Sequence, residues 1–451
     1  MTTGSRQRRI ARTYLALSAL DYFADFMLSV TALLLLQERG FGSAAIFAMI
    51  AAVWITEAVF EIPTGVIADM IGRRASVLLS LLLRAVGTGA LFFSSRVEVA
   101  VAGMLLAAVG LTFWSGALEA WAVDESGAPG TGQLDRLFSL SRIAENAGLV
   151  SGTFAGAALG SVSLALPQLA AGLICVAGLG LAGLWMTEDR SAVAADQAGR
   201  LGARLWASTR EVASGARHTL RGDRILVALI GVSAVLLALR GIPGVQWTVF
   251  FERSAGAGLF VVAVMRSASS LLEIPVLAWV LRRQHSGDHL RRRIIIVAAW
   301  SGAGCLTVAA LAPSPAVSVL AYIAYSLALG VTMPGVRAAI NERLTSRHRA
   351  TALSVAALVN ALMCGVGLVV VGARVNDLAS VAHTWPIAAA GIVLAGGVMG
   401  ALSGRARGTP AVPDLPGATP PAITPPAIVV APGTAGRSAS TVAEASHAAS
   451  R

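Results

Sequence analysis

Predominantly apolar stretches of roughly 20 residues or more recur along most of this chain, and each is long enough to cross a bilayer as a helix. Hydrophobic residues make up 56% of the 451 residues and charged residues only 13%, whereas soluble domains carry about 25% charged residues. A single soluble core cannot bury this much apolar surface. Membrane strands are excluded because the stretches are too long and too continuously apolar. The sequence therefore predicts an all-α membrane protein.

The apolar stretches divide into twelve predicted spans. They are expected as helices at residues 11–36, 42–68, 75–95, 97–122, 138–162, 164–186, 224–250, 256–281, 292–312, 316–340, 350–372 and 381–403. The first stretch is too long for a cleavable signal, contains two aspartates and precedes many further spans, so it is predicted to remain in the protein. Two six-helix bundles are expected, at residues 1–186 and 224–403.

Two polar segments lie outside these spans. Residues 187–223 are an Arg-rich cytoplasmic linker, in which an amphipathic surface helix is expected around Leu205 to Leu220. Residues 404–451 are rich in Pro, Ala, Thr and Ser and contain few large apolar side chains. This composition predicts a disordered cytoplasmic tail.

The basic residues number 35, and all of them are arginines, giving a formal net charge of +11. Most loop arginines fall on the side of the membrane that carries the N-terminus. This asymmetry predicts a multi-pass protein of the bacterial inner (plasma) membrane with both termini in the cytoplasm. Their placement between spans favours lipid headgroups over nucleic acid as their partner. Cys175, Cys305 and Cys364 fall inside spans and are predicted to be small core residues, not disulfides or metal ligands.

The two halves of the chain resemble one another. Glu61-Ile62-Pro63 in the second span recurs as Glu273-Ile274-Pro275 in the eighth. Two further matches keep the same order at nearly the same offset. Upstream, Glu38-Arg39 matches Glu252-Arg253, and downstream, Arg136 and Asn146 match Arg349 and Asn360. Because each half has an even number of spans, both begin on the same side of the membrane. The halves are therefore predicted to be parallel repeats related by an axis along the membrane normal.

The most distinctive local motif lies between the second and third spans. The chain reads GVIADMIGRR from Gly65 to Arg74. A glycine at position 65 permits close helix approach, and Gly72 permits a backbone turn. Asp69 is expected to pair with Arg73 or to cap a helix terminus. These features suit a tight cytoplasmic loop.

This loop resembles the signature loop of the major facilitator superfamily, a Gly, then Ala-Asp, then Gly with two basic residues. The segments SGALEAW from Ser115, with Asp124, and NER from Asn341, with RAT from Arg349, are similar to drug-exporter-like members. The resemblance also covers the span count and the two-half repeat. It implies alternating access by two rocking bundles and a substrate cavity lined by spans one, four, seven and ten. It further implies a functional monomer without a cofactor, in which the loop Asp and Arg residues hold the cytoplasmic side closed.

Charged residues inside the spans are candidate functional groups, because each costs about 2.5–3.5 kcal/mol on insertion scales. Asp21 lies near the middle of the first span, Asp25 lies one turn further on the same face, and Tyr22 is nearby. Two acids one turn apart in a low dielectric do not both ionise easily, so one can take up and release a proton near neutral pH. Asp21 and Asp25 are therefore the leading candidates for proton coupling or substrate contact. Glu57 is a further candidate.

The remaining candidates have alternative interpretations. Arg240 either holds an anionic substrate group or offsets Asp25. Tyr22, Trp114 and Trp247 are cavity candidates, and the tryptophans are alternatively interfacial aromatics. Interhelical structural pairs are expected for Arg84, Arg142 and Glu145. The full set of predicted gating or structural charges is Glu61, Asp69, Arg73, Arg74, Arg84, Glu119, Arg142, Glu145, Arg266 and Glu273.

The leading functional hypothesis is a proton-coupled exporter of small lipophilic or amphiphilic compounds such as drugs or antibiotics. The alternative within transport is an importer or facilitator of a metabolite or siderophore-like solute. A non-transporting membrane sensor is a third class, disfavoured because buried acids would then have no use. No phosphate-binding loop, zinc-protease motif or nucleophile elbow occurs in a suitable context, so an ATP-driven pump, a hydrolase, a metal site and a cofactor are not expected.

Overall fold

The structure is a computed structural model that describes residues 3–126, 131–188, 210, 223–254, 256–284, 288–341, 343, 349–374 and 381–405. The chain divides into two units, Met1–Thr409 and Pro410–Arg451, and the second lies outside the described residues. So do most of the predicted linker at 187–223, its surface helix, and nearly all of the predicted tail. The domain boundaries given above stay predictions.

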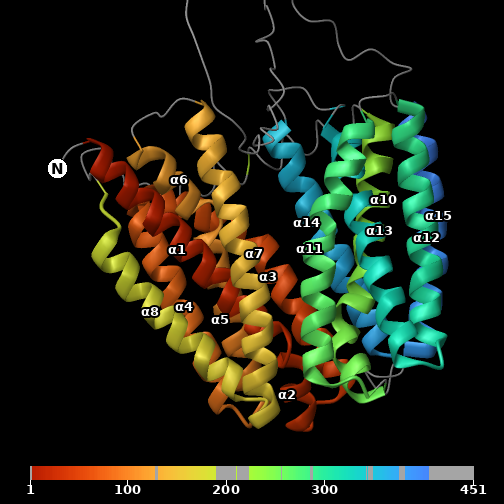
Figure 1. The fold of residues 1–451 in the computed structure, drawn as a ribbon, viewed down its shortest axis with the longest axis horizontal. Helices are drawn as coiled ribbons and strands as arrows, with labels where there is room; N and C mark the ends of the chain where they lie inside the picture. The colour runs from red at the N-terminus through yellow and green to blue at the C-terminus, as the bar shows by residue number, and fades with distance from the viewer. Residues whose placement is uncertain are drawn as a thin grey trace, which may run out of the picture. The chain divides into compact units, whose positions relative to one another are not determined.

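The described residues of the first unit form helices joined by short connections (Figure 1). The first bundle contains α1 (Thr3–Ser29), α2 (Ala32–Glu38), α3 (Ser43–Ile71), α4 (Arg73–Phe93), α5 (Val97–Trp114), α6 (Ala117–Glu125), α7 (Thr131–Val162) and α8 (Leu166–Trp185). The second contains α10 (Arg224–Val249), the π-helical turn η3 (Phe250–Ser254), α11 (Gly258–Gln284), α12 (Asp288–Leu311), α13 (Pro315–Asn341), α14 (Arg349–Gly372) and α15 (Val381–Arg405).

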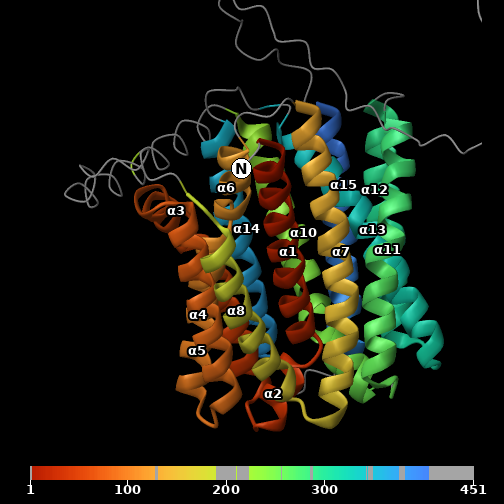
Figure 2. The same ribbon diagram turned by 60° about the vertical axis from the view of Figure 1, so that its left-hand side comes forward.

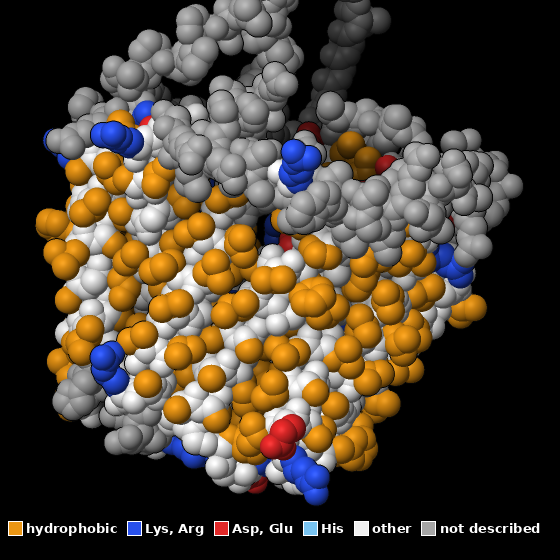
Figure 3. Space-filling view, turned by 180° about the vertical axis from the view of Figure 1, so that it is seen from behind, with side chains coloured by type: hydrophobic (Ala, Val, Ile, Leu, Met, Phe, Trp, Pro, Cys, Tyr) orange, Lys and Arg blue, Asp and Glu red, His pale blue; other side chains and the backbone are white. Residues whose placement is uncertain are grey.

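Eleven spans of the described residues are long and apolar enough to cross a membrane. The remaining candidate is α7, which has 32 residues but a lower hydropathy, because Arg142, Glu145 and Asn146 lie within it. The prediction of about twelve spanning helices is therefore confirmed. On the face shown in Figure 3, hydrophobic side chains cover most of the described surface between its two ends, as a lipid-facing surface requires.

Three predicted spans are interrupted helices. The first is divided into α1 and α2, and the seventh passes from α10 into η3. The fourth is broken between α5 and α6 at Ser115 and Gly116, where Gly116 has a φ of 72°. This left-handed conformation is one that glycine adopts without steric penalty.

Helix packing repeats between the two bundles (Figures 1 and 2). In the first bundle α1 packs on α7 and α8, α4 packs on α5 and α8, and α3 packs on α5. In the second bundle the equivalent helices make the same set of contacts: α10 with α14 and α15, α12 with α13 and α15, and α11 with α13. The bundles meet through α3 with α14 and α7 with α11, which are also equivalent pairs. The parallel repeat predicted from the Glu-Ile-Pro tripeptides is therefore present in the architecture.

The two ends of the helices differ in how tightly the bundles meet. We call the end where α3 passes into α4 the Gly72 end, and the end where α2 passes into α3 the Phe41 end. A buried apolar cluster at the Phe41 end joins α2, α3 and α5 of the first bundle to α10 and α14 of the second. It includes Phe41, Phe47, Val249 and Leu368. This cluster closes the space between the bundles at the Phe41 end.

The start of α10 is fixed by a capping carboxylate at the Gly72 end. The Asp223 side chain accepts hydrogen bonds from the backbone N–H groups of Ile225 (2.9 Å) and Leu226 (3.1 Å) and pairs with Arg343 (2.5 Å). Partial burial acts to raise the pKa of Asp223, but the bonds from Arg343 and the two backbone groups hold it below its usual value. The carboxylate therefore stabilises this end at neutral pH, and that contribution is lost only in acid, as the pH falls through the lowered pKa.

A ladder of four glycines on α7 sets its distance from α1. A Cβ atom at Gly148, Gly152 or Gly156 would lie 2.3–2.4 Å from a backbone carbonyl oxygen of α1, and one at Gly160 would lie 2.5 Å from the Thr31 side chain. Small residues at every fourth position allow two membrane helices to approach this closely. The spacing of four residues between these glycines is present in the sequence.

We predict that Gly152→Ala destabilises the protein, because the added methyl group meets the backbone of Phe23 at 2.3 Å, which cannot move aside as a side chain can. The expected loss is about 1–3 kcal/mol, measured as a lower thermal unfolding midpoint in nanodiscs. Gly89→Ala on α4 is the matched control, since nothing lies within 4 Å of a Cβ atom there. Equal midpoints for the two variants would contradict this account of α1–α7 packing.

Candidate functional site

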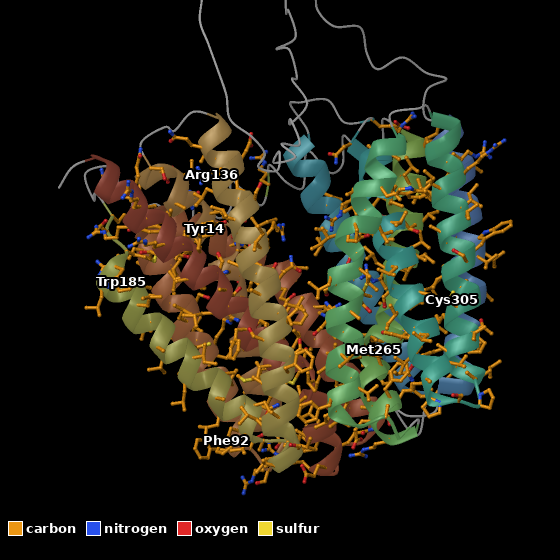
Figure 4. The ribbon with its side chains drawn as sticks, in the orientation of Figure 1. Tyr14, Phe92, Arg136, Trp185, Met265 and Cys305 are labelled. Carbon is orange, nitrogen blue, oxygen red and sulfur yellow. The ribbon has the colours of Figure 1, made fainter. Side chains whose placement is uncertain are left out.

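A cavity of about 930 Å³ lies between the two bundles. Its walls come from α1 and α3 of the first bundle and from α10, α11, α13 and α14 of the second. The hollow in Figure 3 shows basic and acidic side chains inside it, and Met265, labelled in Figure 4, is one of the lining residues on α11. The described lining contains no residue of α5 or α6, so the expectation that span four lines the cavity is wrong for this structure.

The lining extends from the halves of α10, α11 and α13 nearer the Phe41 end, which carry Arg240, Arg266 and Tyr325, to the half of α3 nearer the Gly72 end, which carries Glu61. Counted from the helix termini at the Phe41 end, with a rise of about 1.5 Å per residue, Arg240 and Arg266 lie roughly 12–14 Å along their helices. On the same count Glu57 and Glu273 lie roughly 21–22 Å along theirs. The cavity therefore has a basic layer formed by Arg240 and Arg266 next to the apolar cluster of the Phe41 end, which we call the floor. An acidic layer formed by Glu57 and Glu273 lies nearer the Gly72 end.

Aromatic side chains surround the floor. The guanidinium carbon of Arg266 lies 4.9 Å from the centroid of the Phe26 ring on α1, a cation–π arrangement. Tyr322 of α13 donates a hydrogen bond to the backbone oxygen of Pro243 (3.3 Å), and its ring lies 5.5 Å from that of Tyr325. The predicted cavity residue Trp247 also belongs to the lining. These rings give the lower cavity an apolar wall that contains two arginines.

The repeated tripeptides place one glutamate on each side of the same cavity. Glu61 on α3 accepts a hydrogen bond from the Ser115 hydroxyl (3.0 Å), at the break between α5 and α6. Glu273 on α11 lies against Gly330 of α13, where a Cβ atom would come within 2.5 Å of the carboxylate. Both glutamates line the cavity, and each lies two residues before a proline inside its helix. The two contacts join equivalent helix pairs in the two bundles.

A second charged group lies inside the first bundle. Arg84 of α4 is 5% exposed and pairs with both Asp21 and Asp25 of α1, with the Asp25 contact at 2.5 Å. The guanidinium carbon also lies 5.9 Å from the Trp114 ring centroid. The repulsion expected between the two aspartates is therefore offset by a shared guanidinium, which the sequence analysis did not pair with them. Arg84 also takes the role suggested for Arg240 as the counter-charge to Asp25.

Glu57 lies between this charged group and the central cavity. It lines the central cavity together with Glu61. It also lines a smaller cavity of about 200 Å³, whose walls include Asp25, Arg84 and Cys175. Glu57 is thus the acidic side chain that contacts both spaces among the described residues. Protonation of Asp25 beside Arg84 and occupancy of the central cavity would both change the electrostatic environment of Glu57.

The signature loop is held by contacts at the start of α4. Asp69 pairs with Arg73 at 2.7 Å, and Arg74 donates a side-chain hydrogen bond to the Gly183 backbone oxygen of α8 (2.6 Å). Gly72 has a φ of 93°, which fits the turn expected there. The close helix approach expected at Gly65 is wrong, because a Cβ atom there would meet nothing within 4 Å.

The loop has a further partner that was not predicted from the sequence. The Glu188 carboxylate, beyond the end of α8, accepts hydrogen bonds from the backbone N–H groups of Arg73 (2.6 Å) and Arg74 (3.3 Å). It therefore satisfies the free N–H groups at the start of α4. Its distance in sequence, over a hundred residues from the loop, left no local pattern from which the contact could be inferred.

Other predicted residues lie outside the cavity. Arg142 pairs with Glu145 at 3.0 Å within α7, so the expected interhelical pair is wrong for these two. Tyr22 stacks on Phe26, with ring centroids 6.0 Å apart, and is not part of the cavity lining as described. Glu119 on α6 is exposed. Trp114 packs with the Arg84 group rather than in the central cavity.

Comparison with known proteins places this architecture. The family model described as Major Facilitator Superfamily matches residues 14–368, and the chain belongs to this family of secondary transporters. A sequence search of curated proteins finds no significant match. The fold is also seen in solved structures of low sequence identity.

Three solved structures illustrate the likeness. The nucleoside transporter NupG is 14% identical, with a TM-score of 0.70, covering 87% of this chain and 98% of that one. The peptide transporter POT in complex with sulfate is 15% identical, with a TM-score of 0.67, covering 90% and 99%. A D-xylose-proton symporter is 15% identical, with a TM-score of 0.64, covering 87% and 97%. At these identities the likeness establishes the fold and not the substrate.

We predict that Arg84→Leu is strongly destabilising, because it leaves Asp21 and Asp25 without a counter-charge inside the bundle. Removing one partner of a buried ion pair costs about 3–5 kcal/mol, read out as a lower unfolding midpoint in nanodiscs. Adding Asp21→Asn and Asp25→Asn to the same protein is expected to restore more than half of the loss. No restoration would show that Arg84 contributes by packing alone.

Proposed function

We propose that this transporter exports a small lipophilic or amphiphilic compound, such as a drug or antibiotic, in exchange for protons. The observation that carries the proposal is the central cavity, closed by apolar packing at the Phe41 end and lined by carboxylates toward the Gly72 end. The cavity has a volume typical of sites for small organic molecules. In the proposed topology the Gly72 end and both termini face the cytoplasm, and the protein acts as a monomer in the plasma membrane.

The cavity wall supports the amphiphilic part of the proposal. Trp54, Trp247, Phe26 and Met265 offer apolar and aromatic surface, while charged groups occupy separate positions in the same cavity. An apolar body would pack on the rings, and a polar group would find an ionic partner. Sites of this kind bind by apolar contact and orient by a few polar groups.

The proton-coupling part of the proposal assigns Glu57, Asp25 and Asp21 to one route. Protonation of Asp25 would weaken its pair with Arg84, and the freed guanidinium would favour the charged form of nearby Glu57. Substrate in the central cavity contacts the same glutamate, so proton and substrate occupancy are linked. One proton moving down about 150 mV supplies roughly 3.5 kcal/mol.

The gating part of the proposal gives Glu61 and Glu273 equivalent gating roles in the two bundles. Glu61 accepts a hydrogen bond from Ser115, and Glu273 lies against Gly330 of α13. Each glutamate precedes a proline in its helix, and proline interrupts the helical hydrogen bonds of α3 and α11. Loss of the Ser115 contact would let α3 move relative to α5 and α6. Asp69, Arg73 and Arg74 are proposed to stabilise the conformation that is closed at the Gly72 end.

Import is the second candidate. One structural neighbour is named as a D-xylose-proton symporter and another as a nucleoside transporter, and the same rocking bundles serve either direction. Under this alternative the cavity would hold a metabolite or siderophore-like solute that enters together with a proton. The two candidates differ in the direction of proton flow: export by antiport moves proton and substrate in opposite directions, and import by symport moves them in the same direction.

We predict that acid-loaded proteoliposomes accumulate lipophilic dyes or antibiotics and lose internal protons as they do so. Antiport requires opposite fluxes whichever way the protein is inserted, whereas symport would require acid outside for accumulation. Transport would be followed with a trapped pH dye while a compound series is screened. Accumulation driven only by external acid would overturn export and favour import, and no proton flux with any transported compound would overturn coupling.

We further predict that Glu57→Gln abolishes proton release while leaving substrate exchange without a gradient largely intact. The variant removes the charge that links the two cavities but keeps the size of the side chain. Asp25→Asn and Asp21→Asn are expected to act in the same direction. Glu98→Gln, at an exposed position at the start of α5, is the matched control. Normal proton coupling in Glu57→Gln, Asp25→Asn and Asp21→Asn would reject this proton route.

A further inference from the structure

The cavity floor carries two positively charged side chains. Arg240 of α10 and Arg266 of α11 both line it and lie close enough to repel one another electrostatically. Within the described part of the chain, neither forms an ion pair with an acidic side chain. Arg84, which is buried in the first bundle, differs sharply because it has two carboxylate partners. Two neighbouring arginines without counter-charges in a low dielectric favour an anion between them.

A buried hydroxyl at the same level is also unused. Tyr325 is 3% exposed and lines the cavity, and its hydroxyl group has no hydrogen-bond partner among the described residues. A buried polar atom without a partner is destabilising, because it has given up its hydrogen bonds to water. The neighbouring Tyr322 differs, because its hydroxyl donates to the Pro243 backbone oxygen. The hydrogen-bonding capacity of the Tyr325 hydroxyl is thus unused.

The acids of the cavity lie in a different layer. Glu57 and Glu273 are roughly 10 Å nearer the Gly72 end than Arg266, from the rise of about 1.5 Å per residue. Glu61 is further still and accepts from Ser115. The field inside the cavity therefore runs from an acidic entrance layer to a basic floor. A molecule with one acidic group gains most when that group reaches the floor.

From these positions we propose that the floor binds the acidic group of an organic anion, a carboxylate, sulfonate or phosphate, through Arg240, Arg266 and the Tyr325 hydroxyl. The apolar body of the anion packs against Trp54, Trp247 and Phe26. The inference rests on the proposed function, because it names the class of compound that occupies the transport cavity. Binding of the anion requires no proton gradient, whereas the proposed export does.

Three compounds with one apolar body test the proposal: 4-butylbenzoate, 4-butylbenzyl alcohol and 4-butylbenzylammonium. Their dissociation constants would be measured at pH 7 with the full chain in nanodiscs of zwitterionic lipid, from tryptophan fluorescence quenching, with empty nanodiscs as the blank. We expect the benzoate to bind about tenfold or more tightly than the alcohol, as charge-assisted hydrogen bonds would require. The ammonium is expected to bind no better than the alcohol.

The variants locate the effect. Arg240→Gln and Arg266→Gln are each expected to weaken benzoate binding about tenfold and to leave alcohol binding within about twofold. Tyr325→Phe keeps the ring and is expected to weaken benzoate binding by a few-fold. Arg337→Gln, on the exposed part of α13 outside the cavity lining, is the control and should leave all three constants unchanged.

Equal affinities for the benzoate and the alcohol in the unaltered protein would overturn the anion site, as would tightest binding of the ammonium. An equal loss in Arg337→Gln would show a general charge effect and would also overturn it. If an arginine variant does not fold, the probe comparison and Tyr325→Phe still decide the question. Since no gradient is applied, the anion preference can fail while coupled transport persists, and coupling can fail while the preference persists.

Discussion

The arrangement of this protein depends on where its charges are placed in a medium that does not solvate them. In the first bundle, Arg84 lies between Asp21 and Asp25, so three charges that would each be costly in hydrocarbon stabilise one another. This group ties α1 to α4, and the glycine ladder of α7 ties α1 to α7. The helices around it therefore have little freedom to move individually, and the first bundle can act as a rigid body.

The second bundle uses its charges differently. Arg240 and Arg266 face the cavity without acidic partners among the described residues, while the shared space is sealed at the Phe41 end by apolar side chains of both bundles. The first bundle neutralises its buried Arg84, whereas the second bundle exposes two arginines to the cavity. Glu57 lies at the boundary of these two arrangements and lines both spaces. An account of transport therefore centres on this one side chain.

Much of the fold followed from the sequence because hydrophobic length and repeat are local properties. The helix count, the two bundles and the turn at Gly72 could be read from span length, the Glu-Ile-Pro tripeptides and the loop motif. The pairing of Arg84 with both aspartates, the cap formed by Glu188 and the absence of span four from the cavity depend on helix rotation, which the sequence does not reveal. Gly65 was misjudged for the same reason, since a glycine on a membrane helix faces either a neighbour or open space.

The measurement that tests the account most directly is the distance between the bundles at each end, by pulsed electron paramagnetic resonance. Spin labels would replace Arg136 and Arg337 near the Gly72 end, and Arg96 and Arg374 near the Phe41 end, after Cys175, Cys305 and Cys364 are changed to alanine. Alternating access through this cavity predicts that lowering the pH in the presence of a transported compound shortens one distance and lengthens the other, and that Glu57→Gln abolishes the pH response. Distances that change together, or an unaltered response in Glu57→Gln, would contradict the account.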